Sequence, residues 1–409
     1  MSQAPPKLGE YRKTWKIVEN TSINIVISRF YKDKTMNDIF IECFSGLEDK
    51  RYKNKRYKLL EIIAIVLCGV MSGMKDFSNI ETFAEEHESW FKKHLKIKNG
   101  IPSHDTLERV IGLLDPAKFT ECFLRWIQHI KDLMKEDVIA IDGKTITGSK
   151  ISSKGKRAIH LVNAYSCANG LTLSQVKVSE KSNEIVAIPE ILSCLSLKGT
   201  IITMDAMGCQ KSITKQIVEA EADYILAVKG NHKSLQEPIQ DIFTLAKNPK
   251  FNKNLQPLTY THEIDCEHGK IESRTVRVFS IEKIAEHTKL EGWHNIQSII
   301  EVENNNLSKN TSELRYYISS IDHTKTELIA KSIRKHWQVE NNLHWVLDVI
   351  FKEDASTVKD EIIAQNMSWI RKIAAFLLQK QLSTKKLSTP KKMVQNCCNP
   401  NYLLDYLEV

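Results

Sequence analysis

The chain lacks any pair of cysteines in the CxxC spacing, although its 409 residues include nine cysteines. Closely spaced cysteine pairs mark zinc sites and disulfide frameworks, so we expect neither kind of site. Scattered, reduced thiols are typical of a cytosolic protein. The cysteines are Cys43, Cys68, Cys122, Cys167, Cys194, Cys209, Cys266, Cys397 and Cys398.

The chain also lacks a long apolar run and a secretory signal. Its most apolar stretch, residues 62–71, is about half as long as the roughly 20 residues that a membrane-spanning helix needs. The first residues, MSQAPPKLGEYRKTWK, have no apolar segment of the kind that an export signal carries after its basic start. We therefore expect neither export nor membrane insertion, and interpret residues 62–71 as a buried helix.

Charge of one sign is only slightly in excess, since 58 Lys and Arg against 50 Asp and Glu give a net charge of +8. Such an excess permits a nucleic-acid partner without requiring one. One short basic stretch could bind phosphates, or could equally be a solvated linker before a helix. It contains Lys50, Arg51, Lys53, Lys55, Arg56 and Lys58, with Tyr52 and Tyr57 between them.

Hydrophobic periodicity divides the N-terminal third of the chain into two segments. Residues 1–55 show weak periodicity, and we interpret them as an N-terminal extension that carries the basic run. In residues 56–135 apolar positions recur at helical spacing, which predicts an α-helical domain. Within it, Ser103 or Asp105 of the segment IPSHDT is the expected N-cap of a helix.

The pattern changes at Val138, where short β-branched runs begin to alternate with helical segments. This alternation over residues 136–243 predicts an α/β sheet domain. Residues 244–324 hold strand-like runs between polar loops, which predicts a β-rich insertion. Helical periodicity returns in residues 325–385, whereas the tail, residues 386–409, shows no clear structure. We find no internal repeat and no low-complexity tract.

Two aspartates stand in the same local setting. Asp142 in IAIDGK and Asp205 in IITMDAMG each follow an apolar β-run and precede small residues. Metal and substrate sites gather at strand ends in α/β folds. A single strand-end Asp can equally cap a turn, but two such residues in a basic chain favour a site.

A third acidic residue lies in the helical segment SIRKHWQVENNLHWVLDVIF. There His336, Glu340, His344 and Asp348 recur every four residues and share one helix face. That face could simply point to water. A zinc site of His336, Glu340 and His344 is another reading, although the HExxH spacing is absent.

Phosphodiester chemistry would explain why three carboxylates are wanted together. Carboxylate oxygens are hard ligands that suit Mg²⁺ or Mn²⁺, and two such ions can stabilise both the attacking and the leaving oxygen. No side chain then needs to act as the nucleophile, because water attacks in hydrolysis and a 3′-hydroxyl attacks in strand transfer.

Many blocks of the sequence resemble the ISAs1 family of insertion-sequence transposases, relatives of the H-repeat-associated proteins. The blocks run in order from about Lys55 to beyond Leu377. They are YKLLEIIAIVLCGVMSGMKDFSNIETFAEEHESWF, NGIPSHDTLERVIGLLDP, AIDGKTITGS, LSQVKVSEKSNEIVAIPEIL, ITMDAMGCQK, DYILAVKGNH, EHGKIESR, RYYISS and HWQVENNLHWVLDVIFKEDAS.

The resemblance implies an RNase H-like catalytic core preceded by a DNA-binding helical domain, with the β-rich insertion between the second and third acidic residues. The implied catalytic and metal-binding triad is Asp142, Asp205 and Glu340. The implied activity is Mg²⁺- or Mn²⁺-dependent DNA transposition: cleavage at terminal inverted repeats and strand transfer into target DNA by a homodimer, with no membrane involved. A bacterial protein of this kind would act in the cytoplasm, on nucleoid DNA.

The sequence departs from the wider IS4-like group, in which the catalytic Glu belongs to a Tyr, Arg, Glu, Lys signature. The corresponding positions here hold Ile333, His336 and Leu347, so His336, Arg334 or Lys352 would have to bind phosphate instead. In that group a Trp of the insertion can stack on a flipped base. Trp293 is the candidate here, unless it is a core residue.

Other cations near the proposed catalytic strands or the insertion could hold DNA phosphates or could be surface charges; they are Lys144, Lys229 and Arg315. Two other functions stay open at this point. A decayed relative would bind DNA without cutting it, and a nuclease of the same type would hydrolyse DNA without joining it.

Overall fold

The computed structural model describes residues 41–52, 55–130, 137–150, 157–178, 184–251, 255–265, 272–287, 290–306, 309–380 and 387–407. Most of the expected N-terminal extension, together with Lys53 of the basic run and Cys266, lies outside these described residues. Among the residues that are described, no helix is long and apolar enough to cross a membrane.

The N-terminal segment is helical, as its periodicity predicts. Its helices are α4 (Leu59–Met71), α5 (Phe77–Glu86), α6 (Glu88–His94), α7 (His104–Leu113) and α8 (Pro116–Ile130). Residues 62–71 lie in α4, and most of their side chains are buried. Ser103 is the N-cap of α7, although its hydroxyl donates to the Thr106 hydroxyl rather than capping a backbone N–H. The long helix α13 (Glu361–Lys380) packs against α4, α7 and α8.

The centre of the molecule is a nine-stranded mixed sheet with the order β3-β2-β1-β4-β5-β9-β8-β7-β6. Strand β1 is antiparallel to β2 and parallel to β4, which in turn is parallel to β5. The strands predicted between residues 138 and 228 are confirmed. The strands are β1 (Val138–Ile146), β2 (Ile159–Ser166), β3 (Leu171–Val178), β4 (Ile201–Met204), β5 (Asp223–Val228), β6 (Leu258–Asp265), β7 (Glu272–Ser280), β8 (Ser298–Asn306) and β9 (Thr311–Ser319).

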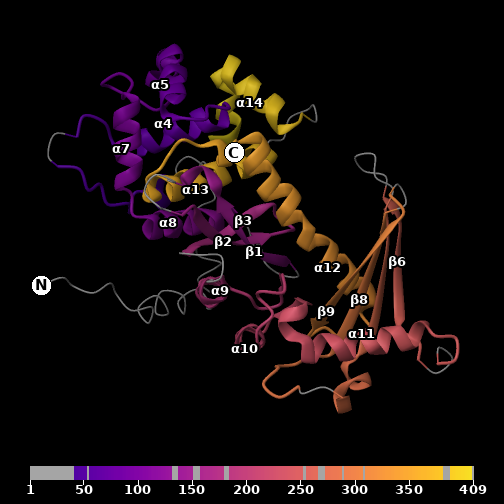
Figure 1. The fold of residues 1–409 in the computed structure, drawn as a ribbon. Helices are drawn as coiled ribbons and strands as arrows, with labels where there is room; N and C mark the ends of the chain where they lie inside the picture. Colours follow the sequence, from indigo (N-terminus) through magenta and orange to yellow (C-terminus); the bar gives the residue numbers. More distant parts are fainter. Residues whose placement is uncertain are drawn as a thin grey trace, which may run out of the picture.

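The β-rich segment forms strands β6 to β9, and these strands extend the central sheet instead of forming a separate one. Strand β9 pairs antiparallel with β5, and β8, β7 and β6 follow outward. Figure 1 shows this extension and helix α11 (Lys233–Lys247) at the end of the molecule opposite the N-terminal helices. The edge of β5 that faces away from β4 is therefore covered by main-chain pairing with β9.

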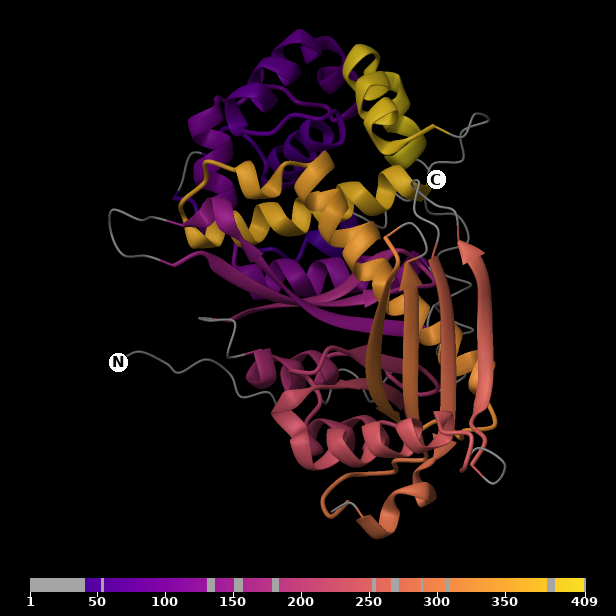
Figure 2. The same ribbon diagram turned by 45° about the vertical axis from the view of Figure 1, so that its right-hand side comes forward.

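Helices cover both faces of the sheet. Helix α9 (Glu184–Ser193) contacts β2 and β3, and α10 (Lys211–Glu219) contacts β5. Helix α12 (Thr326–Gln338) crosses the strands diagonally and contacts β1, β4, β5, β6 and β7 (Figure 2). Short 3-10 helices connect these elements: η1 (Thr147–Ser149), η4 (Gly230–His232), η6 (Ile281–Lys283) and η7 (Ala285–His287).

After α12 the chain continues as two π-helical segments, η8 (Val339–His344) and η9 (Val346–Ile350), and a 3-10 turn, η10 (Glu353–Ala355). The last elements are α14 (Thr389–Cys398), η11 (Pro400–Leu403) and α15 (Leu404–Leu407).

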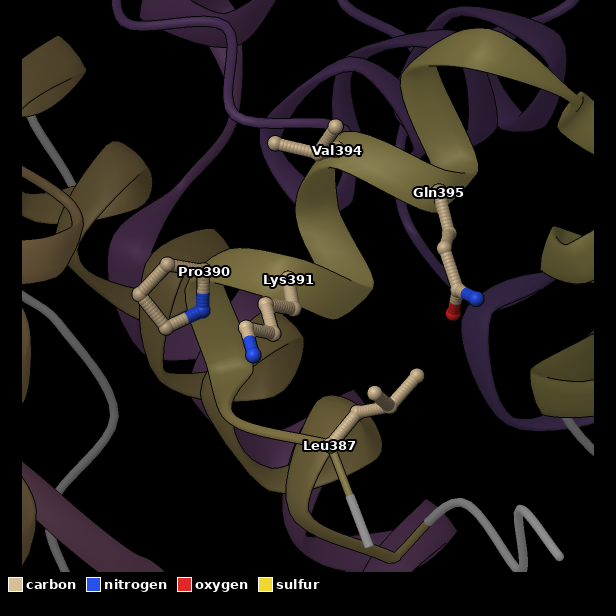
Figure 3. A pocket seen from close by; sticks show the side chains of 5 residues that line it. All are labelled: Leu387, Pro390, Lys391, Val394 and Gln395. Atoms are coloured by element: carbon tan, nitrogen blue, oxygen red, sulfur yellow. The ribbon is translucent and has the colours of Figure 1, made fainter. Parts of the chain in front are cut away.

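The interpretation of the tail as unstructured is wrong for residues 387–407. Helix α14 begins after Ser388, and Pro390 lies in its first turn, where a missing N–H is tolerated. The proline therefore marks a helix start. One side of α14 lines an open pocket with Leu387, Pro390, Lys391, Val394 and Gln395, none of which is a predicted site residue (Figure 3).

Candidate active site

The two aspartates lie side by side at one end of the parallel strands. In the pairing of β1 with β4, Ile141 lies opposite Met204, so Asp142 and Asp205 come next on adjacent strands. Strand β4 ends at Met204, and Asp205 accepts backbone N–H groups of Met207 (2.9 Å) and Gly208 (3.4 Å) in the turn that follows. The two positions therefore lie side by side, but only Asp205 follows a strand end. The strand-end setting expected for Asp142 is wrong, because β1 continues to Ile146 through its pairing with β2 and Asp142 lies within the strand, just beyond the part that pairs with β4.

Glu340 reaches the same region through helix α12, which contacts β1 and β4 and continues as the π-helical segment η8. In η8, Val339 and Leu343 are buried while Glu340 is exposed. Segment η8 itself contacts β1, the strand that carries Asp142. π-Helical turns are rare and occur frequently at functional sites, because they rotate the side chains that follow.

Electrostatics tie the three acidic residues together. The pKa of Asp142 is raised from 3.8 to about 7, mainly by burial and in addition by the negative charges of Glu340, Asp205 and Glu184. A hydrogen bond from the Gly143 N–H to Asp142 Oδ1 (2.9 Å) acts in the opposite direction. Asp142 is thus within electrostatic reach of both other members of the predicted triad.

The described residues contain no group of three or more His, Cys, Asp or Glu that is already arranged to hold a metal ion. The three carboxylates share one region without meeting at one point. Their chemistry nevertheless fits a hard divalent cation, because all the donors are carboxylate oxygens. A cation would also offset the energetic cost of keeping the buried Asp142 ionised.

Two histidines lie beside strands β1 and β4, and burial lowers the pKa of each so that both are neutral at pH 7. The pKa of His336 is lowered to about 4, and its Nδ1 lies 2.9 Å from the Thr203 hydroxyl. The pKa of His344 is lowered to about 3, and its Nδ1 lies 3.6 Å from Asp142 Oδ2. The His336 ring faces Thr203 and the His344 ring faces Asp142, an arrangement that does not favour a zinc ion shared by the two histidines and Glu340. A neutral His336 also brings no positive charge to a phosphate.

Lys144, predicted to hold phosphate, is buried among carboxylates. Its Nζ lies 2.5 Å from Asp348, 3.6 Å from Asp354 and 3.8 Å from Glu353. These acids belong to η9 and η10, so Lys144 fastens the segment that follows Glu340 onto strand β1. Its position does not favour a DNA contact.

The remaining predicted DNA-binding residues lie around the site. Lys229 is exposed just after β5, the strand next to β4. Trp293 is half-buried against the main core, with its ring centroid 5.4 Å from that of His232. Trp293 therefore packs partly against the core, and its stacking on a base stays a prediction. Arg315 on β9 places its guanidinium 4.5 Å from the Trp337 ring centroid, and Arg334 lies on α12.

A buried polar row beside Asp142 was not identified from the sequence. In the sheet register Asp142 lies opposite Asn163, and Asn163 lies opposite Gln175. Lys372 of α13 donates to Asn163 Oδ1 (2.6 Å) and to Gln175, and burial lowers its pKa to about 7. Nothing in the segment WIRKIAAFLL marks this lysine, because its partners come from strands about two hundred positions away.

Beneath the site, on the opposite face of the sheet, Gly143 leaves room for a buried pair. His160 Nε2 lies 2.6 Å from Glu184 Oε1, and the other ring nitrogen lies 2.7 Å from the Thr145 hydroxyl. A Cβ on Gly143 would overlap the side chains of both Glu184 and His160. The glycine after Asp142 is therefore required by packing.

The helices and the sheet make this a mixed α/β protein, and the adjacent carboxylates of Asp142 and Asp205 give it an acidic candidate active site. A family model described as Transposase DDE domain matches residues 133–377, and one described as DDE_Tnp_1-associated matches residues 41–127. The chain belongs to the DDE transposase domain family.

The relatives bear matching names. "Putative transposase YncI" of Escherichia coli O157:H7 is 38% identical over 371 residues, 88% of this chain and 92% of that protein. "H repeat-associated putative transposase YhhI" of Escherichia coli K12 is 38% identical over 378 residues, 90% of this chain and 97% of that protein. A cryo-EM structure of the piggyBac transposase synaptic complex with hairpin DNA overlays with a TM-score of 0.41 and 13% identity, covering 93% of this chain and 82% of that chain.

Proposed function

We propose that this protein is a DNA transposase that cleaves the ends of its own element at terminal inverted repeats and joins them to target DNA. The observation that carries the proposal is the position of Asp142 and Asp205 side by side on neighbouring parallel strands, with the segment that bears Glu340 in contact with β1, in a member of the DDE transposase domain family. The resemblance of successive sequence blocks to the ISAs1 subfamily supports the same reading. The helical segment before the sheet, residues 56–135, is the proposed DNA-binding domain.

The proposed catalytic core is RNase H-like and consists of residues 136–243 and 325–385. The order β3-β2-β1-β4-β5 supports this, since β2 alone is antiparallel to both of its neighbours within these strands. In this proposal the triad consists of Asp142 on β1, Asp205 after β4 and Glu340 after α12. The strands of the insertion enter between the second and third of these residues.

Asp142, Asp205 and Glu340 are the residues that would hold Mg²⁺ or Mn²⁺, with two ions as the proposed number. When bound, such ions stabilise the negative charge on the attacking and leaving oxygens of a phosphodiester. The chain itself supplies the positions of the ligands. The Gly143 N–H orients Asp142, the turn amides orient Asp205, and Lys144 anchors the segment beyond Glu340.

The proposed substrate, DNA, also implies an oligomeric state and a cellular compartment. The protein would act on DNA as a homodimer, as the family resemblance implies, in the cytoplasm of a bacterial cell. Lys229, Arg315 and Arg334 are the proposed phosphate contacts.

A strand-transfer assay tests this function. Full-length protein is incubated with Mg²⁺, labelled DNA from both flanks of its gene, and a target plasmid. We expect cleaved ends and labelled joint products from the wild type. Asp205→Asn should still bind the DNA but give neither product, whereas Asp241→Asn, on the exposed side of α11, should behave as the wild type.

Each other result has a definite meaning. Cleavage without joint products would indicate a nuclease, and binding without cleavage would indicate a decayed relative. Undiminished cleavage by Asp205→Asn would refute the assignment of the triad.

A further inference from the structure

The two faces of the sheet extension differ in how their positive charges are matched. On the face away from α12, Arg277 of β7 donates to Glu301 (2.8 Å) and to Glu303 (2.7 Å), and Lys247 pairs with Glu301 (2.9 Å). Every cation in this set therefore faces a carboxylate. These bonds raise the pKa of Arg277 even though burial opposes them.

The face toward α12 begins as an apolar surface. Val276 of β7 and Val302 of β8 lie opposite each other and pack with Ile329 and Ile333 of α12. Because side chains alternate along a strand, Arg274 lies on the same face as Val276. Arg315 lies opposite Val302 in the next pairing and shares this face too. The apolar cluster thus gives way to arginines toward one end.

Arginines from three elements lie toward that end, where their charges act on one another. Arg274 of β7 donates from Nε to Asn304 Oδ1 (2.6 Å), which is a neutral amide. Burial lowers the pKa of Arg274, and the neighbouring charges of Arg334 and Arg315 lower it further, with Glu272 acting against them. Arg315 pairs with Glu313 on its own strand at 2.9 Å. Like charges that are held together and partly desolvated repel one another, and an anion relieves that repulsion.

The surroundings of these arginines suit a nucleic-acid backbone. Arg315 is fixed over the Trp337 ring, so its guanidinium is oriented before any ligand arrives. Arg334 and Trp337 precede Glu340 on one continuous helical stretch. Six residues at about 1.5 Å each put Arg334 about 9 Å from Glu340 along the axis. That spacing corresponds to two or three nucleotides at about 3.4 Å each.

We propose that Arg274, Arg315 and Arg334 form a binding site for a DNA phosphodiester, two or three nucleotides from the phosphate that is cut. The site rests on the proposed function, since its ligand is the same DNA. Arg274 is the member to test, because it donates to a neutral amide and has Arg277 as a counterpart on the opposite face of the same strand. Strands β7 and β9 would then bind the DNA strand on the side of the site from which it approaches Glu340.

The test is the salt dependence of DNA binding by the full-length protein. Fluorescence anisotropy with a labelled duplex carrying the element end gives the affinity between about 50 and 200 mM salt. Losing one phosphate contact lowers the slope of log affinity against log salt by about 0.9, so the fall in affinity over that range becomes roughly threefold smaller. We expect this change for Arg274→Gln and not for Arg274→Lys, which keeps the charge.

Arg277→Gln is the matched control, because it removes the same charge from the same strand on the opposite face. Its slope should equal that of the wild type. An unchanged slope for Arg274→Gln, or an equal change for both variants, would overturn the site while cleavage by the wild type leaves the function standing. If the wild type neither binds nor cuts the DNA, the site and the function both fail.

Discussion

Replacing Asp142 with Asn is expected to stabilise the metal-free protein at and above pH 7. The folded state raises the pKa of Asp142 from 3.8 to about 7, chiefly through burial. Between these two pH values the folded protein holds a proton that the unfolded chain has released. The free energy of unfolding therefore falls as the pH rises through this window, and the full penalty applies above pH 7. Asn carries no charge and removes the penalty.

The shift of about 3 pKa units corresponds to about 4 kcal/mol, at about 1.36 kcal/mol per unit. The side chain is 18% exposed, so solvent screens part of that charge and about 2 to 4 kcal/mol is the expected gain. Asn keeps a carbonyl oxygen at the place of Oδ1 and can still accept the hydrogen bond from the Gly143 N–H. Little else changes with the substitution.

Thermal unfolding in EDTA at several pH values between 4 and 8 gives the measurement. The midpoint of Asp142→Asn should exceed that of the wild type by several degrees at pH 8, and the difference should shrink toward pH 4. Adding Mg²⁺ should raise the midpoint of the wild type more than that of the variant. The reasoning would be refuted if the variant were less stable than the wild type at pH 8, or if the difference between their unfolding midpoints did not change with pH.

Two further substitutions probe the support of the site. Gly143→Ala should lower the free energy of unfolding by about 1 to 3 kcal/mol, because the added methyl group overlaps Glu184. In Gly230→Ala the added methyl group contacts no atom, so the free energy of unfolding should not change. Denaturant unfolding measures both values, and equal effects would contradict the packing argument. Lys144→Met should cost about 1 to 3 kcal/mol, because Asp348 loses its hydrogen bond while the buried Glu353 keeps Arg371 at 3.6 Å, and it should abolish cleavage. A stable, active variant would show that the anchor is unnecessary.

The placement of Asp142 and Asp205 could be predicted because the signal is local. An apolar run of strand length followed by Asp and small residues predicts a carboxylate near a strand end, and the two runs form neighbouring parallel strands, so the two positions come side by side. The strand end itself is observed for Asp205 and not for Asp142, because pairing with β2 continues β1 to Ile146. The relation of Glu340 to these strands depends on how α12 crosses the sheet and on the π-helical turn after it. No local pattern encodes either feature, so the family resemblance had to supply that residue.

Other parts of the site depend on contacts between distant segments. Lys144 reads as a free surface cation, yet acids two hundred positions later bury it. The row from Asp142 through Asn163 to Lys372 exists only because of sheet register and the packing of α13. The tail was misread for a different reason, since a proline in the first turn of a helix resembles a proline in a loop.

The central claim is that Asp142, Asp205 and Glu340 form one metal centre. The most direct measurement is a structure of the full-length protein with its end DNA and Mn²⁺, in which anomalous scattering locates the ions. We expect Mn²⁺ between the three carboxylates, with Glu340 turned toward the strand ends. Ions bound elsewhere, or a Glu340 carboxylate directed away from both aspartates in the DNA complex, would contradict the account.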